Sequence, residues 1–533
     1  MDRVFINGRI YTVDADFGLA EAVAVRDGRF LAVGTNEEAG AAAGSGAETI
    51  DLGGRVAVPG IVESHLHLSL LGTFLLQINA VGKTKEAVLA EIAAEAGGAR
   101  AGEWVCGRGW NELTWQDTAM PTRAELDAVS PQAPTCMIRV CGHSVWVNSK
   151  ALELAGIDRN KPDPVGGEIC RDASGEPNGI LVDTAAQMVR KLMPPLGDDK
   201  KRVAYALAQK HLLSFGITNV HDMAAMSGYD YGTIEFLKRM YEERVLSIGV
   251  ASYISAYSAD EAYRVGPEIG LFGGRFTARG IKFFSDGSLG ARSAWMLDDY
   301  DDRPGHKGNG RYTDGELYEM VLVARTHGFQ PALHAIGDAA NRQALDVYER
   351  VLKKVPEPLD HRFRIEHAQI LDADDLERFS KLGVIPSMQF THCTSDKDMI
   401  GGRIGERRLG GAFAWRTLLD RGSIIPGGSD APVEPVSPFW GMHAALTRQD
   451  RESRPAGGWR PQERTTRREA LRSFTIWGAF AAFEEGAKGS VEPGKLADLA
   501  VLDRDVMTCE PEAIKDTVCT ATILGGEVVY GSL

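Results

Sequence analysis

Two histidines, His65 and His67, stand one residue apart in the stretch Ala57–Ser69, which reads A-V-P-G-I-V-E-S-H-L-H-L-S. In an extended strand alternate side chains point to the same face, so this spacing directs two imidazoles toward one point where the strand ends. Two converging neutral imidazoles suit a divalent transition metal. An H-x-H pair also occurs by chance on loops, so its meaning depends on the rest of the chain.

Four further polar residues lie in or directly after short apolar runs. Lys282 lies in G-I-K-F-F, His334 ends P-A-L-H, His367 ends F-R-I-E-H, and Asp430 closes G-G-S-D. A lone histidine of this kind is more often a core or loop residue whose hydrogen bonds are satisfied. Four such residues, added to the H-x-H pair, favour a metal site assembled from the ends of several strands.

These residues need a scaffold that brings strand ends together. Ala57–Glu63 and seven later runs number eight, and segments with helical spacing such as Asp338–Lys354 lie between them. Strand–helix alternation predicts a parallel sheet, and eight repeats fit a closed (β/α)8 barrel of the TIM type, whose active site lies at the carboxyl ends of the strands. The later runs are Gly216–His221, Leu246–Ala251, Ala278–Phe284, Phe329–His334, Phe363–His367, Val384–Met388 and Ile424–Gly428.

Both ends of the chain have a different pattern, typical of antiparallel hairpins. Val4–Val13 and Glu21–Val33 alternate apolar and polar residues around turn dipeptides, and Ala497–Asp503 and Thr520–Tyr530 do so near the C-terminus. Chain termini tend to lie close together in a compact fold. We therefore predict one small composite β-sandwich domain from residues 1–56 and 485–533.

The barrel is then predicted to comprise residues 57–71 and 201–484, with residues 72–200 inserted after its first strand. The insertion is far longer than a crossover connection requires and holds too many large apolar residues to be a linker. It is expected to form an α/β subdomain. Because it leaves the first strand at the functional end of the barrel, it is expected to roof the active site.

The composition excludes several classes of protein. A formal net charge of −14 over 533 residues offers no basic field for nucleic acid or an anionic membrane. The sequence has no signal-peptide pattern and no apolar stretch long enough to span a bilayer. Seven cysteines without a C-x-x-C pair argue against a disulfide framework and a cysteine-held zinc. These features predict a cytoplasmic protein that binds neither nucleic acid nor a membrane.

Seven motifs spread along the chain carry a family resemblance. They are P-G-I-V-E-S-H-L-H (59–67), G-H-S-V-W-V-N-S (142–149), G-I-T-N-V-H-D-M (216–223), D-G-S-L-G-A-R (286–292), H-A-I-G-D (334–338), R-I-E-H-A-Q (364–369) and G-S-D-A-P-V (428–433). The set resembles the amidohydrolase superfamily, in particular the branch that includes N-substituted formamide deformylase and related metal-dependent hydrolases.

This resemblance implies a set of metal ligands: His65, His67, Lys282, His334, His367 and Asp430. The first two histidines would hold the more buried ion and the other two the second, and the lysine, carboxylated on its amine, would bridge them. Zinc is the expected ion, in one or two copies, although manganese, iron and cobalt accept the same ligands. An unmodified lysine paired with Asp286 is the alternative to carboxylation.

The implied reaction is hydrolysis of an amide-like C–N bond, such as that of an N-formyl or N-acyl group. Asp430 would take a proton from the attacking water and later give one to the departing nitrogen, so it would act first as general base and then as general acid. Two other functions stay open: a metal-dependent deaminase of a ring amidine, and a non-catalytic regulatory protein that kept the fold. The substrate itself is not encoded in a readable way, because rim loops decide it.

Candidates for substrate binding are His143, Trp146, Asp286, Arg292, Gln369 and Gln389. For Trp146 and its neighbour His143 the alternative is a packed aromatic beside a hydrogen-bonding residue. Arg292 could receive an anionic group, or form a salt bridge with an aspartate such as Asp298. His221, at the end of the second strand, would either support a metal ligand or contact substrate. A homodimer is the commonest assembly of soluble enzymes and is the expectation here.

Overall fold

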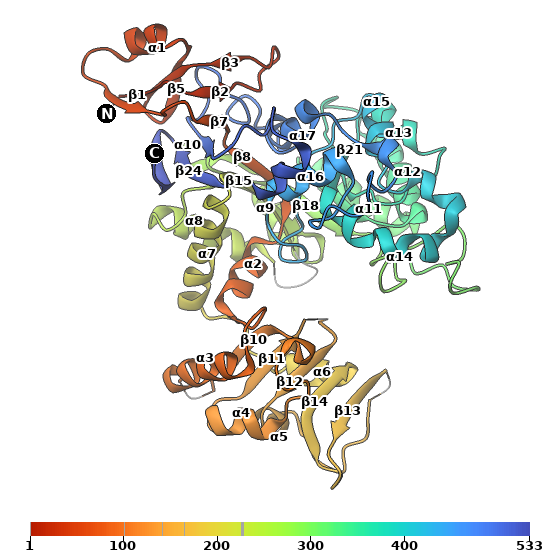
Figure 1. The fold of residues 1–533 in the computed structure, drawn as a ribbon. Coiled ribbons are helices and arrows are strands. Elements are labelled where there is room, and N and C mark those ends of the chain that lie inside the picture. The colour runs from red at the N-terminus through yellow and green to blue at the C-terminus, as the bar shows by residue number, and fades with distance from the viewer. Residues whose placement is uncertain (1, 101, 141, 165, 225–228) are drawn as a thin grey trace. The chain divides into compact units, whose positions relative to one another are not determined.

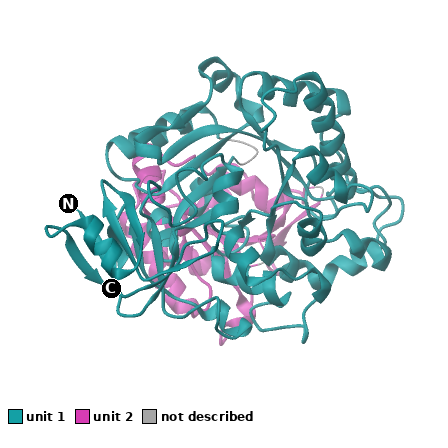
Figure 2. Cartoon of the chain, turned by 90° about the horizontal axis from the view of Figure 1, so that it is seen from above, with its two compact units in different colours: residues 1–71, 208–533 teal, residues 72–207 magenta. Residues whose placement is uncertain are grey.

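The structure, a computed structural model, describes residues 2–100, 102–140, 142–164, 166–224 and 229–533 (Figure 1). It divides into two compact units, which Figure 2 shows in different colours. One unit joins residues 1–71 to residues 208–533, and the other comprises residues 72–207. The functional residues at the strand ends all belong to the first unit.

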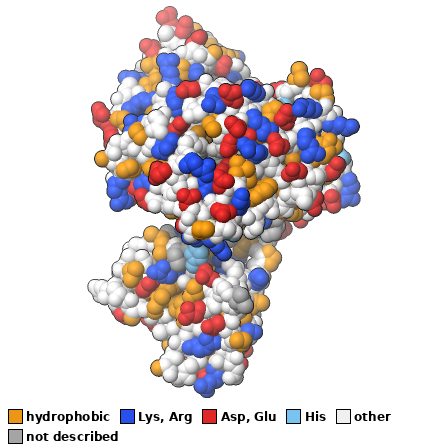
Figure 3. All heavy atoms as spheres, turned by 90° about the vertical axis from the view of Figure 1, so that its right-hand side faces the viewer, with side chains coloured by type: hydrophobic (Ala, Val, Ile, Leu, Met, Phe, Trp, Pro, Cys, Tyr) orange, Lys and Arg blue, Asp and Glu red, His pale blue; other side chains and the backbone are white. Residues whose placement is uncertain are grey.

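The surface agrees with the composition. On the face drawn in Figure 3, lysines and arginines are interspersed with aspartates and glutamates. Among the helices that the structure describes, none has both the length and the apolar character that a membrane crossing requires. The six described cysteines are all free thiols.

Eight parallel strands of the described chain form the barrel of the first unit. Neighbours pair in parallel in the order in which they occur along the chain, with β17 outside this path. The ring is nearly closed by a parallel bridge between Leu66 and Ala431. The predicted (β/α)8 barrel is thus confirmed. Its strands are β8 (Ile61–Leu66), β15 (Ile217–Met223), β16 (Gly249–Ser255), β18 (Phe276–Phe284), β19 (Gln330–Ala335), β20 (Arg364–His367), β21 (Ile385–Gln389) and β22 (Gly427–Gly428).

Helices alternate with these strands, as the apolar spacing predicts. In α12 (Asp338–Lys354) the residues Ala340, Ala344 and Val347 recur at helical spacing and are fully buried. An acidic residue at the start of α12 and two lysines at its end complement the helix dipole. The other large helices of the unit are α8 (Tyr231–Glu242), α11 (Asp314–Thr326), α14 (Phe390–Arg408) and α16 (Pro438–Thr447).

The first predicted barrel strand, Ala57–Glu63, is split at Gly60. β7 (Val56–Pro59) pairs with strands of a terminal sheet, and β8 begins only at Ile61. A Cβ at position 60 would overlap Thr218 and lie 2.7 Å from Cβ of Asp498, so the close approach requires glycine. The strand predicted at Ala57–Glu63 is therefore two strands, one in a terminal sheet and one in the barrel.

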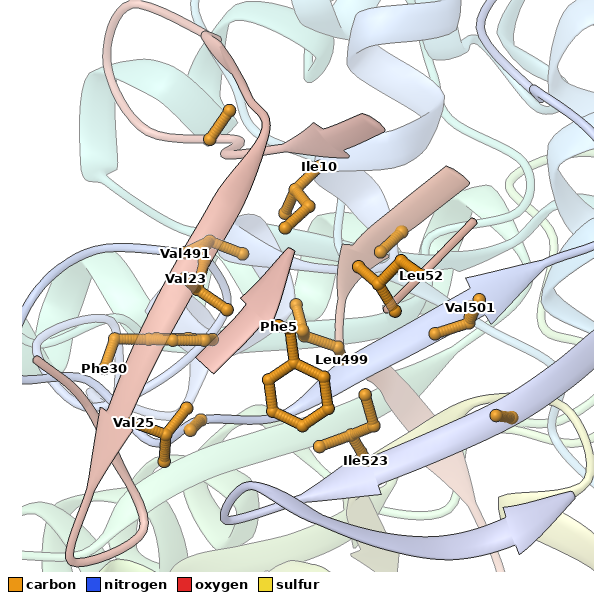
Figure 4. Packing of buried hydrophobic residues seen from close by; sticks show 14 residues of the cluster. Phe5, Ile10, Val23, Val25, Phe30, Leu52, Val491, Leu499, Val501 and Ile523 are labelled. Atoms are coloured by element: carbon orange, nitrogen blue, oxygen red, sulfur yellow. The ribbon is translucent and has the colours of Figure 1, made fainter. Parts of the chain in front are cut away.

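The two ends of the chain build two sheets that share one core. The four-stranded sheet contains β5 (Arg29–Gly34), β4 (Ala22–Arg26), β1 (Arg3–Ile6) and β6 (Glu48–Asp51), and the six-stranded sheet contains β25 (Glu527–Gly531), β24 (Cys519–Leu524), β23 (Leu499–Leu502), β7, β2 (Arg9–Tyr11) and β3 (Leu19–Ala20). Figure 4 shows Phe5 and Val25 from the N-terminal strands beside Leu499 and Ile523 from the C-terminal ones. Both ends thus form a β-sandwich, in the same compact unit as the barrel.

The second unit has α/β structure of its own. Its six-stranded mixed sheet has the order β13 (Gly167–Arg171), β14 (Pro177–Asp183), β12 (Ser144–Val147), β11 (Thr135–Arg139), β10 (Val105–Trp110) and β9 (Ile78–Asn79). Helices α3 (Lys85–Gly98) and α4 (Arg123–Val129) supply side chains to its core, including Val88 and Leu126. The predicted boundary at residue 200 falls inside helix α7 (Asp198–Leu213), and the unit extends to Leu207.

Candidate metal centre

Four histidines and one aspartate meet at the carboxyl ends of the barrel strands. His65 lies in β8 and His67 directly follows it, His334 lies in β19, His367 ends β20, and Asp430 follows β22. Ring centroids are 5.7 Å apart for His65 and His67, 4.9 Å for His65 and His367, and 4.5 Å for His334 and His367. Oδ1 of Asp430 lies 3.0 Å from Nε2 of His67 and 3.4 Å from Nε2 of His65.

The backbone at this point is strained and tightly packed. His367 and Asp430 have φ angles of +73° and +60°, in the left-handed region that residues other than glycine rarely adopt. The amide of Asp430 donates a hydrogen bond of 2.8 Å to the carbonyl of His65. A Cβ at Gly428 would lie 2.7 Å from both Oε1 of Glu63 and the amide nitrogen of His65, so β22 approaches β8 only because residue 428 is glycine.

Three of the histidines are held in one tautomer. In each, Nδ1 lies 2.6 Å from an oxygen that can accept a hydrogen bond but cannot donate one. The oxygen belongs to the carboxylate of Glu366 for His65, to the backbone carbonyl of Met223 for His67, and to the side-chain amide of Gln389 for His367. Nδ1 therefore carries a hydrogen, so in the neutral imidazole the lone pair is on Nε2 and can bind a cation. Hydrogen bonds of this kind fix the orientation of metal-binding imidazoles. Gln389, a predicted substrate contact, thus accepts a hydrogen bond that orients the ring of His367.

Glu366 is kept ionised by a buried arginine. The guanidinium of Arg364 donates to both carboxylate oxygens of Glu366, at 2.7 and 3.1 Å, and neither side chain is exposed. Burial raises the pKa of Glu366, but Arg364 and His65 lower it by more, so the pKa lies well below its ordinary value. Arg364 also donates to Nδ1 of His221 at 2.8 Å. His221 is thus connected through Arg364 and Glu366 to His65, which is consistent with its predicted role of supporting a metal ligand.

Lys282 is fully buried on β18, and no salt bridge joins it to a carboxylate within the described ranges. Burial lowers the pKa of its amine to about 8. Its Nζ has no hydrogen-bond partner among the residues that the structure describes, and it lies 5.2 Å from the ring centroid of Phe284. The alternative pair with Asp286 is not formed, because the carboxylate of Asp286 accepts hydrogen bonds from the amides of Trp295, Ile336 and Gly337.

The donor atoms fit a divalent cation. Nε2 of His67 and Oδ1 of Asp430 lie 3.0 Å apart, close enough to share either the proton of an imidazolium or a metal cation. Nε2 of His65 and Oδ1 of Asp430 are buried and lack a hydrogen-bond partner within the described ranges. Burial raises the pKa of Asp430, but His65 and His67 lower it by more, to well below its ordinary value. The carboxylate is therefore ionised at neutral pH.

The structure adds one residue that the sequence did not single out, His392. It lies in the first turn of α14, and its ring stacks on that of His367 with centroids 5.9 Å apart and planes inclined by 13°. Its Nε2 is 3.9 Å from Oδ2 of Asp430. The sequence analysis considered only residues at the ends of strands, and His392 lies on a helix. Its position three residues after Gln389, where β21 ends, was the one feature that pointed to it.

The donor atoms form two groups that share Asp430, in each of which they lie within 4.8 Å of one another. One group is His65, His67 and Asp430, and the other is His367, His392 and Asp430. His334 lies beside them, with its Nε2 3.2 Å from the carbonyl of Gly287 and 3.3 Å from Oδ1 of Asp286. The chain can therefore offer ligands for more than one ion at a single centre.

Two predicted substrate contacts of the barrel unit have other partners. Arg292 forms a two-contact salt bridge with Asp302, at 3.0 and 2.9 Å, in place of the expected alternative with Asp298. The amide of Gln369 donates to Oδ2 of Asp396 at 2.6 Å. These contacts hold loops that follow barrel strands.

The two candidates of the second unit differ in exposure. Trp146 is completely buried against Trp110 and Trp115, and its indole nitrogen donates to the carbonyl of Thr122 at 2.8 Å. The structure corrects the prediction that Trp146 contacts substrate, because it leaves no surface for a ligand; the packed aromatic is the observed alternative. His143 is exposed, and its Nδ1 lies 2.8 Å from Asp183.

Comparison with known proteins gives one family that covers most of the chain. The profile of the amidohydrolase family matches residues 48–530. N-substituted formamide deformylase of Arthrobacter pascens is 30% identical over 546 residues, covering 99% of this chain and 98% of that protein. LONG AFTER FAR-RED 3 of Arabidopsis thaliana is 32% identical over 541 residues, covering 99% and 91%. An uncharacterized metal-dependent hydrolase from Pyrococcus furiosus superposes with a TM-score of 0.78 at 29% identity, covering 95% of this chain and 100% of that one.

Proposed function

Because the chain belongs to the amidohydrolase family, we propose that it is a metal-dependent hydrolase that cleaves an amide-like C–N bond, such as that of an N-formyl or N-acyl group, in a small molecule. The observation that carries the proposal is the convergence of Nε2 of His65 and His67 on Oδ1 of Asp430, at 3.4 and 3.0 Å, which are separations typical of ligands about 2.1 Å from one zinc ion. The name of the Arthrobacter relative, a formamide deformylase, supports the N-formyl class.

The residues that would hold the metal are His65, His67, His334, His367 and Asp430, with zinc as the expected ion. When bound, the ion supplies Lewis acidity that activates water and polarises the carbonyl to be cleaved. Glu366 and Gln389 hold the hydrogen on Nδ1 of their histidines, so the Nε2 lone pairs stay directed at the centre.

Asp430 is the proposed general base. Its carboxylate is ionised at neutral pH, so it can accept the proton of the attacking water and later give it to the departing nitrogen. Its backbone, held at a φ of +60° by the hydrogen bond to His65, fixes where that carboxylate lies. A base with a fixed position loses little entropy when it acts.

Carboxylation of Lys282 belongs to the same proposal. Only a neutral amine can add to carbon dioxide, forming an N–C bond and releasing a proton to give a carbamate. Because the pKa of Lys282 is about 8, roughly one amine in ten is neutral at pH 7, against fewer than about one in a thousand at its ordinary pKa. The carbamate would offer two oxygens that share a negative charge, in place of an amine that has no hydrogen-bond partner among the described residues.

The experiment is a screen of N-formyl, N-acyl amino acid and cyclic amide compounds against the purified, zinc-replete protein. Asp430→Asn is expected to lower kcat/KM at least 100-fold, while the exposed control Asp398→Asn keeps it within twofold. Turnover of Asp430→Asn within tenfold of the unmodified enzyme would remove it as base. Release of ammonia from a ring amidine would favour the deaminase alternative. Substrate contacts by His143, Asp286, Arg292, Gln369 and Gln389, the cytoplasmic location and the homodimer stay predictions.

A further inference from the structure

His392 faces the metal centre but belongs to no ligand set expected from the sequence. Its side chain is 13% exposed, and its Nε2 is buried with no hydrogen-bond partner in the part of the chain that the structure describes. A buried ring nitrogen without a partner is costly, so its presence calls for a ligand. Phe390 and Cys393, its neighbours in the first turns of α14, are fully buried and anchor the segment.

The two carboxylate oxygens of Asp430 face different histidines. Oδ1 lies beside Nε2 of His65 and His67, at 3.4 and 3.0 Å, whereas Oδ2 lies 3.9 Å from Nε2 of His392. A separation of 3.9 Å is too long for a hydrogen bond. Two ligand atoms that each lie about 2.1 Å from one tetrahedral zinc ion are about 3.4 Å apart, so a shift of about 0.5 Å lets Oδ2 and Nε2 share a cation.

His367 supplies the third donor of this group. Its Nδ1 is held by Gln389, which leaves Nε2 free, and its ring lies parallel to that of His392. The donor atoms of His367, His392 and Asp430 all lie within 4.8 Å of one another. Movements of less than about 1 Å for each donor bring all three within bonding distance of one ion, since tetrahedral ligands at about 2.1 Å lie about 3.4 Å apart.

We propose that His392 is a ligand of a second metal ion that it shares with His367 and Asp430. This inference rests on the proposed function, because it needs a metal centre at the strand ends. Two imidazoles and one carboxylate form a sufficient protein ligand set for a zinc-type ion. The second ion is then held by residues 367, 392 and 430 without any contribution from the amine of Lys282.

The test is a titration of the chelator-treated full chain with Co2+, followed by absorbance and by equilibrium dialysis with metal analysis. The unmodified protein is expected to bind two ions. His392→Gln is expected to bind the second ion at least tenfold more weakly, while the matched control His327→Gln, which alters an exposed histidine at the end of α11, binds both unchanged. His392→Cys is expected to bind both ions and to show a thiolate-to-cobalt charge-transfer band that the unmodified protein lacks.

The inference is overturned if His392→Gln binds both ions within threefold of the unmodified affinity and His392→Cys shows no such band. His67→Asn separates this failure from failure of the proposed function. If His67→Asn loses an ion and His392→Gln does not, the hydrolase proposal stands and only the role of His392 falls. A chain that binds no Co2+ in its unmodified form would overturn both.

Discussion

Replacing Lys282 by methionine is expected to stabilise the metal-free protein while it removes a proposed metal ligand. The amine is completely buried, and its Nζ finds no hydrogen-bond partner among the described residues. Methionine has a similar length, carries no charge and adapts to irregular apolar surroundings. The substitution therefore removes the cost of burying a cation and leaves the volume of the barrel interior nearly unchanged.

The magnitude follows from the pKa. Burial lowers the pKa of Lys282 from 10.5 to about 8. Below pH 8 the amine is protonated in both the folded and the unfolded state, so the folded protein bears the full penalty; between pH 8 and 10.5 only the unfolded chain keeps the proton, so stability rises with pH. A shift of about 2.5 units at about 1.36 kcal/mol per unit is on the order of 3 kcal/mol.

The assay is urea denaturation of chelator-treated protein in bicarbonate-free buffer at pH 7 and pH 10. Lys282→Met is expected to raise the free energy of unfolding by about 3 kcal/mol at pH 7 and by much less at pH 10. The control Lys353→Met, at an exposed lysine of α12, is expected to change it by less than about 0.5 kcal/mol at either pH. A Lys282→Met protein no more stable than the original at pH 7, or a gain that persists at pH 10, would refute the reasoning.

Three other substitutions test the supports of the centre. Glu366→Gln is expected to weaken metal binding about 10- to 100-fold in a chelator competition, because His65 loses its charged partner; unchanged affinity would contradict that role. Gly428→Ala places a Cβ 2.7 Å from Glu63 Oε1 and is expected to lower both stability and metal content, whereas Gly40→Ala, in open space on α1 (Asn36–Ala43), is expected to be neutral or stabilising; equal effects would sink the steric argument. Trp146→Ala is expected to cost about 3–5 kcal/mol in the unfolding of residues 72–207 and to leave metal content unchanged, and a lost metal ion would show that the tryptophan serves the centre.

The elements that were predictable from the sequence are those that local periodicity defines. The helix Asp338–Lys354 has the predicted bounds, because its apolar spacing and its charged ends are properties of neighbouring residues. The third strand, predicted at Leu246–Ala251, lies at Gly249–Ser255 instead. Its later half contains Ser252 and Tyr253, whose hydroxyl groups form hydrogen bonds with Tyr229 and Gln330. No pattern in the neighbouring sequence predicts those partners.

Features that depend on distant contacts could not be predicted. The break between β7 and β8 follows from Thr218 and Asp498, which crowd Gly60 from far along the chain. The burial of Trp146 follows from Trp110 and Trp115, which stack around it, and a tryptophan in a motif looks the same whether it lines a pocket or fills a core. Residue type and spacing therefore singled out Trp146 but could not predict whether it is buried or lines a pocket.

At the metal centre, too, some features follow from local sequence and others depend on distant contacts. The rule that barrel sites gather at strand ends found the candidate ligands on β8, β19 and β20, because each strand places its last residues at one rim. It could not find His392, which reaches that rim from a helix. Nor could it say which ring nitrogen of His65 or His367 faces inward, since Glu366 and Gln389 decide this through their hydrogen bonds. A metal site therefore depends both on the residues that bind the ion and on the residues that orient those ligands. The positions of strand ends in the sequence predict only some of the ligands and not the hydrogen bonds that orient them.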